Sequence, residues 1–267
     1  MSNNINGATK LPPRLRGPRA IEFIAYVLAI AFFIVSLSGT EWSMIAFVEG
    51  IPNLMTFLSE AFPPSLTRLQ QTGSALLETF QMALVGTVMG VLISLPLAIF
   101  AAKNLAPHWS VYQLSRGLIA LARTVPDLIW ALIFVIMVGL GPFAGTLAIM
   151  VDTLGFCARF FAESMEEADP GPQEALTAMG ASPTSKIFCA VIPDAMPSFI
   201  NVSLFALEKA TRSSVILGLV GAGGIGIELK VSMDMFEYSQ AATIILSIFI
   251  LVIIVEQLSG GLRRKIL

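Results

Sequence analysis

The chain has 267 residues, of which 55% are hydrophobic and 13% charged, with a mean hydropathy of +0.80 and a formal net charge of −2. A soluble domain carries about 25% charged residues, so this chain has too few to cover a water-soluble surface. The composition indicates an all-α polytopic membrane protein. His108, Cys157 and Cys189 show no metal-ligand spacing, and we expect neither a metal site nor a disulfide.

The first 20 residues form a basic tail, which an apolar run of about 20 residues follows. A secretory apolar core is usually about 7–15 residues long, so we expect this run to stay in the bilayer as an uncleaved anchor. A helix needs about 20 apolar residues to cross a membrane. By that measure we predict six spans, at about residues 21–39, 73–102, 118–140, 143–161, 197–220 and 241–262.

Lysine and arginine concentrate on one side of this arrangement, in the tails 1–20 and 263–267 and in the loops after the second and fourth spans. The other side has only Arg68 and Lys230. Because cytoplasmic loops carry the excess of basic residues, we predict that both termini and residues 162–196 are cytoplasmic. Residues 41–72 are then external, and their amphipathic part at 51–65 either lies in the interface plane or packs on the bundle.

The cytoplasmic interruption contains QEALTAMGASPTSKIFCAVIP at residues 173–193. Prolines at 170 and 172 prevent the fourth span from continuing as one helix. A short helix should follow and end at Gly180, which suits a left-handed residue. Ser182 can cap a second helix that has Pro183 at its first position, and we expect Pro193 to end that helix.

This hairpin is similar to the EAA motif of ABC-importer permeases, written E-A-A, three residues, Gly, nine residues and I-x-L-P. The residues that occupy the frame are Glu174, Ala175, Leu176, Gly180, Ile192 and Pro193. Leu176 replaces the second alanine, and Ala190 stands where isoleucine is usual. The resemblance implies a coupling helix that docks into a cytoplasmic ATPase through Glu174, Ala175, Leu176, Gly180, Ala181, Ser182 and Pro193. The alternative is an amphipathic loop on the membrane.

Residues 120–149, 169–182 and 210–226 narrow the resemblance to the phosphonate-type permease, within a likeness that covers about residues 75–262. It implies a type I importer fold, related to the methionine permease, in the bacterial cytoplasmic membrane. It also implies a homodimer that carries phosphonate, phosphite or hypophosphite, with two ATPase copies and an external substrate-binding protein, and no nucleic-acid partner. The chain has no GxxxxGK[ST] loop, so ATP and Mg²⁺ should bind in the partner ATPase and this subunit should be no enzyme.

Ionisable side chains inside spans are costly in lipid and are therefore candidates for function. Arg123 and Asp127 stand four residues apart in the third span, as do Glu208 and Arg212 in the fifth. Opposite charges at this spacing can pair on one helix face. One interpretation is structural ion pairs between helices. The other is a translocation pathway for a small oxyanion, because a guanidinium matches phosphoryl oxygens.

Proline and glycine mark possible hinges and gates. Pro126 removes a backbone donor inside the third span and can loosen it. The GAGGIG run at 221–226 has glycine-fingerprint spacing, but no strand precedes it. We expect a flexible external turn there, in which Gly221, Gly223 and Gly224 form either a gate or a re-entrant loop against the binding protein.

Two rival functions remain open from the sequence. A permease of the same fold could carry another small solute, such as methionine, which uptake measurements would reveal. A stand-alone carrier or channel would transport without an ATPase and would tolerate changes at Glu174 or Gly180. A membrane scaffold is a third possibility that no feature supports.

Overall fold

The structure is a computed structural model that describes residues 20–40 and 42–266, except for the side chain of Ile266. The predicted basic tail therefore lies outside the described residues, apart from Ala20. The described part of the chain contains helices and no β-strand, which confirms the all-helical class. Contacts divide the chain into two units, residues 1–56 and residues 57–267.

The first unit contains α1, Ala20–Gly39, and most of α2, Met44–Ala61. α1 has 20 residues and is long and apolar enough to cross a membrane, as predicted for residues 21–39. Of the segment at 51–65, α2 covers residues 51–61 and ends before Phe62.

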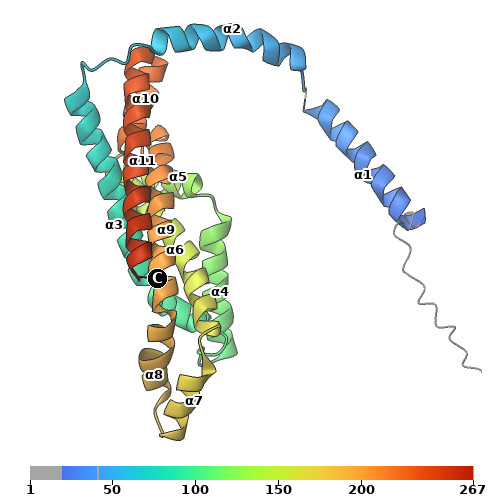
Figure 1. Cartoon of the computed structure of the whole chain (residues 1–267), viewed down its shortest axis with the longest axis vertical. Coiled ribbons are helices and arrows are strands. Elements are labelled where there is room, and N and C mark those ends of the chain that lie inside the picture. Colours follow the sequence, from blue (N-terminus) through green and yellow to red (C-terminus); the bar gives the residue numbers. More distant parts are fainter. Residues whose placement is uncertain (1–19, 41, 267) are drawn as a thin grey trace, which may run out of the picture. The chain divides into compact units, whose positions relative to one another are not determined.

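The second unit is a helical bundle. Its elements are α3 Leu69–Ala101, α4 Trp109–Thr124, α5 Asp127–Val138, α6 Pro142–Glu166, α7 Pro170–Ala178, α8 Pro183–Lys186, the π-helix η1 Ile187–Val191, α9 Ile192–Leu219, α10 Ile225–Asp234 and α11 Tyr238–Ile266. In Figure 1, α3, α6, α9 and α11 run lengthwise, α7 and α8 project at one end, and α10 lies at the other. The described residues hold five candidate spans, or six if α4 and α5 form one.

The contact between α3 and α6 depends on two glycines four residues apart. A Cβ atom at Gly86 would lie 2.7 Å from Ile149 Cγ2, and one at Gly90 would lie 2.7 Å from Thr153 Cβ. Membrane helices gain little from hydrophobic burial against each other, and close approach at small residues supplies packing energy instead. The GTVMG pattern at 86–90 therefore lets the two helices touch along their backbones.

The predicted third span, 118–140, is not one helix. α4 and α5 meet at a bend of 92°. Val125, at the break, is extended with ψ 120°, because a residue before proline is disfavoured in the helical region. Pro126 is the N-cap of α5. Pro126 therefore does more than the predicted loosening of the third span: it divides the span into two helices.

The predicted stop at Pro193 is wrong. A continuous helical run extends from Pro183 to Leu219, and within it η1 ends at Val191, two residues before Pro193. A π-turn moves the carbonyls out of α-helical register, and proline has no N–H to leave unpaired. The run therefore passes through the proline, and the expected fifth span at 197–220 is the upper part of a longer element.

The predicted C-terminal tail, 263–267, is helical through Ile266. α11 extends the predicted sixth span at both ends, and Arg263 packs against α9 in an ion pair with Glu208. Arg263, one of the three basic residues of this predicted tail, thus belongs to the bundle. The assignment of the two sides of the membrane stays a prediction.

Candidate functional site

The predicted coupling hairpin projects from one end of the bundle as α7 and α8 (Figure 1). α7 ends in a Schellman motif, in which the Ala181 N–H donates to the Leu176 carbonyl at 3.0 Å. Gly180 supplies the residue that this motif needs at positive φ, at +77°. α8 begins with Ser182 as its N-cap, whose hydroxyl accepts a backbone N–H at 3.2 Å, and with Pro183 in its first turn. The predicted glycine stop, serine cap and proline position are confirmed.

Polar contacts brace the base of the hairpin. The Asp169 N–H donates to the Asp194 carboxylate at 2.9 Å, and the Gln173 amide donates to the Asp169 carbonyl at 3.1 Å. No residue of α7 or α8 is buried, and Met179 is 74% exposed. The hairpin therefore presents small and apolar side chains on a fixed backbone. The candidate coupling residues that it brings together are Glu174, Ala175, Leu176, Gly180, Ala181 and Ser182. Pro193 lies apart from them, in α9.

Arg123 and Asp127 do not form the intrahelical pair that their spacing predicts. Arg123 ends α4 and Asp127 begins α5, on either side of the break at Pro126. An Asp127 carboxylate oxygen accepts the Leu128 N–H at 2.9 Å. Arg123 is exposed and has no ion-pair partner in the described part of the chain.

Three arginines line a pocket of about 330 Å³ between α4 and α6. Arg116 pairs with Glu166 at 2.7 Å, and Arg159 pairs with Glu163. Arg123 then leaves one uncompensated positive charge at this pocket. A guanidinium can bind a phosphoryl group through two parallel hydrogen bonds, so the pocket can attract a small oxyanion.

Glu208 and Arg212 do not pair with each other either. Glu208 is 7% exposed and pairs with Arg263 of α11 at 2.6 Å. The next residue, Lys209, pairs with Asp152 of α6 at 2.8 Å. Adjacent residues of opposite charge therefore tie α9 to two different helices, which supports the structural interpretation for this part of the site. Arg212 is exposed and, like Arg123, has no ion-pair partner among the described residues.

The turn after α9 is tightly packed, contrary to the flexible turn that the glycines suggested. Three glycines here have positive φ: Gly221, Gly223 and Gly224. Residues 222–226 are buried. A Cβ atom at Gly223 would lie 2.6 Å from Pro142 Cα, and the Gly224 N–H donates to the Glu78 carboxylate at 2.8 Å. The glycines allow the turn to seat against α3 and α6, and their role as a gate stays a prediction.

Two ionisable residues within predicted spans, Glu78 and Glu256, were not among the predicted site residues. Glu78 fastens the glycine turn to α3, and Glu256 lines a pocket of about 790 Å³ with Glu208 and Arg263. The rule that singled out Glu208, a charge inside an apolar run, would have found both of them. What the rule could not show is which helix each charge contacts.

Comparisons with known proteins decide the family. A family model described as "Binding-protein-dependent transport system inner membrane component" matches residues 94–266. The chain belongs to this family. It is 37% identical to the phosphite transport system permease protein PtxC of Stutzerimonas stutzeri, over 94% of this chain and 89% of that protein. It is 26% identical to the probable D-methionine transport system permease protein MetI of Vibrio cholerae, over 71% of this chain and 89% of that protein.

A solved structure has the same fold. It is an inward-facing conformation of the MetNI methionine ABC transporter, with a TM-score of 0.67 at 23% identity, covering 76% of this chain and 99% of that chain. The predicted type I importer fold is confirmed. The chain is thus a multi-pass inner-membrane permease subunit of an ABC importer, a class that works with an ATPase and a substrate-binding protein.

Proposed function

We propose that two copies of this chain form the pore of an importer for phosphorus oxyanions of the phosphonate, phosphite and hypophosphite class. The observation that carries the proposal is the 37% identity to a phosphite permease along almost the whole of both chains. A phosphate-import permease protein, PhnE of Mycolicibacterium smegmatis, is 39% identical over 72% of this chain and 36% of that protein. The likeness to the methionine permease is weaker, at 26%.

The charges of the site support an anionic cargo. Of the four predicted pathway residues, Glu208 is neutralised by Arg263, whereas Arg123 and Arg212 lack ion-pair partners in the described residues. Asp127, the remaining one, offsets part of this charge. An unpaired arginine at membrane depth needs an anion or water beside it. A phosphorus oxyanion offers oxygens that match the planar guanidinium donors.

The hairpin of α7 and α8 is the proposed docking point of the ATPase, with one ATPase copy for each permease copy. This assignment makes the α7 end cytoplasmic, together with both termini. In support, Lys103 and Arg116 gather near that end, where Glu166 contacts both of them. ATP would close the two ATPase copies, and their movement would reach the spans through the hairpins. The glycine turn at the other end would then form the external gate.

Reconstitution tests the proposal. Proteoliposomes that contain this permease and its ATPase, supplied with the substrate-binding protein, should take up phosphite or a phosphonate only when ATP is present. Uptake of methionine without any phosphorus oxyanion would establish the rival cargo. Uptake without the ATPase would establish a stand-alone carrier and contradict the proposal outright.

One substitution tests the pathway. Arg212→Gln should lower oxyanion uptake at least tenfold while the complex assembles normally. The substitution removes a charged hydrogen bond between the Arg212 guanidinium and the oxyanion. Lys265→Gln, at another exposed cation, is the matched control and should transport as wild type. Unaltered uptake by the Arg212 variant would remove it from the pathway.

A further inference from the structure

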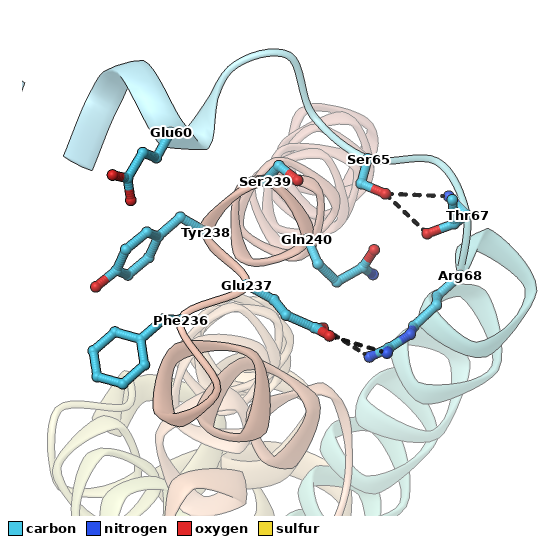
Figure 2. Close-up of a pocket in the computed structure, with 9 residues that line it drawn as sticks. All are labelled: Glu60, Ser65, Thr67, Arg68, Phe236, Glu237, Tyr238, Ser239 and Gln240. Carbon is cyan, nitrogen blue, oxygen red and sulfur yellow. Dashed lines mark hydrogen bonds and ion pairs between the residues drawn. The ribbon is translucent and has the colours of Figure 1, made fainter. Parts of the chain in front are cut away.

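A polar pocket of about 340 Å³ is drawn in Figure 2. The helices α10 and α11 that contribute to it meet at the end of the bundle away from α7 (Figure 1). The pocket forms where the chain between α2 and α3 meets the loop between α10 and α11. No part of the proposed pathway or coupling hairpin lines it. It is therefore a separate site that needs its own explanation.

The pocket carries a net negative charge. Both terminal nitrogens of Arg68 bond to the two carboxylate oxygens of Glu237, at 2.9 and 3.2 Å, so these two charges cancel. Glu60 is exposed and has no ion-pair partner among the described residues. Figure 2 shows these side chains around the opening. A carboxylate is thus left free to meet a cation.

The wall of the pocket also has an unused acceptor. Gln240 is 5% exposed, and its amide nitrogen donates to Thr72 Oγ1 at 3.4 Å. Its Oε1 atom has no hydrogen-bond partner in the part of the chain that the structure describes. A buried acceptor without a partner is unfavourable, so a donor that reached this atom would be stabilised. The unpaired carboxylate of Glu60 favours an ammonium or guanidinium group in the pocket.

Beside the pocket, an aromatic side chain stands out from the surface. Phe236 is 74% exposed and has a φ of +58°, a conformation that is uncommon for a bulky residue. Its neighbour Met235 is 64% exposed. This φ belongs to the Schellman motif that ends α10, in which the Phe236 N–H donates to the Met233 carbonyl at 3.1 Å and the Glu237 N–H donates to the Ser232 carbonyl at 2.9 Å. Aromatic and methionine side chains are enriched at the centres of protein interfaces, inside a polar rim.

We propose that this surface docks the external substrate-binding protein, with a lysine or arginine side chain of that protein in the pocket against Glu60 and with Phe236 packed on its surface. The inference rests on the proposed function, which makes this end of the bundle external. The charge of the whole end agrees, because its carboxylates outnumber its cations: Glu60, Glu228, Asp234 and Glu237 against Arg68 and Lys230. Such a face attracts a basic partner and speeds its encounter.

The test measures equilibrium binding of the purified substrate-binding protein to the permease–ATPase complex in lipid nanodiscs. Phe236→Gly removes the ring and suits the positive φ, so the fold is kept, and binding should weaken at least tenfold, as expected for an interface anchor. Glu60→Lys should weaken binding about threefold to tenfold and reduce its salt dependence. Trp109→Ala, which alters another exposed aromatic residue, and Glu167→Lys are the matched controls and should bind as wild type.

A charge-swap experiment identifies the occupant of the pocket. Replacing the docking lysine or arginine of the binding protein by glutamate should restore binding to the Glu60→Lys permease. If no such reversal restores it, or if both permease variants bind as wild type, the inference is overturned. If Phe236→Gly changes only the amount of lipid that the complex retains, Phe236 is a lipid anchor and the inference is also overturned. Failure of the wild-type complex to import anything with ATP and binding protein would instead refute the proposed function.

Discussion

The glycine contact between α3 and α6 yields a quantitative prediction for Gly90→Ala. The added methyl group would lie 2.7 Å from Thr153 Cβ and 2.8 Å from the backbone carbonyl oxygen of Met150. A backbone oxygen cannot rotate away as a side chain can. To reach an ordinary contact of 3.4 Å, the two helices must separate locally by about 0.6 Å or distort.

The expected cost follows from two opposing terms. Overpacking by one methyl group costs about 1–3 kcal/mol, whereas alanine favours a helix over glycine by about 1 kcal/mol. Gly117→Ala gains the second term alone, because a Cβ atom at Gly117 in α4 meets no atom within 4 Å. Gly90→Ala should therefore be less stable than Gly117→Ala by about 1–3 kcal/mol. At about 2–4 °C per kcal/mol, their melting temperatures should differ by about 2–12 °C.

A cysteine in α6 can report the unfolding. Cys157 is 0% exposed, whereas Cys189 is exposed. In a Cys189→Ser background, a thiol-reactive fluorophore should label Cys157 only as the bundle opens on heating. Equal melting temperatures for the Gly90 and Gly117 variants would refute the reasoning, because the packing of α3 on α6 would then tolerate a methyl group.

Three further predictions concern the site. Gly180→Ala places a side chain at φ +77°, at a cost of about 1–2 kcal/mol, and should weaken co-purification of the ATPase while Cys157 labelling stays as in wild type. Lys209→Met leaves Asp152 unpaired and should destabilise the bundle by about 1–3 kcal/mol. This cost is below the range for a fully buried pair, because both groups are partly exposed. Adding Asp152→Asn should recover most of the lost stability, and no recovery would contradict the pairing. Gly223→Ala, with φ +91° and a Cβ atom 2.6 Å from backbone, should lower the melting temperature more than Gly90→Ala, and a smaller effect would show that the turn can yield.

Local chemistry made the hairpin predictable from the sequence. A glycine that must adopt positive φ, a serine before a helix and a proline in its first turn each act through neighbouring backbone atoms. Gly180, Ser182 and Pro183 therefore lie where expected. The error at Pro193 has the same local origin. Proline usually ends a helix, but the preceding π-turn changes the hydrogen-bond register, so the helix continues past Pro193.

The charged residues could not be paired from the sequence, because their partners are distant along the chain. Spacing of four residues suggested Glu208 with Arg212, yet Glu208 contacts Arg263, 55 positions away. Lys209 and Asp152 are separated by 57 positions. Spacing reports which residues share a helix face, and the packing of α6, α9 and α11 decides which faces meet. Arg123 and Asp127 failed for another reason, the break at Pro126 between them.

The continuous run from Pro183 to Leu219 gives the fold a mechanical connection that six separate spans would lack. Its 37 residues correspond to about 55 Å of helix at 1.5 Å per residue. One end continues directly into the coupling hairpin, and the other ends at the glycine turn that Glu78 fastens to α3. Between them, Glu208 and Lys209 tie the run to α11 and α6. Because both ends belong to one helix, force applied at the hairpin is transmitted along it unless the helix bends. The π-helix at Ile187–Val191 and the prolines at 193 and 197 interrupt its regular hydrogen-bond ladder. All of them lie on the hairpin side of the two ion pairs, so bending would concentrate there.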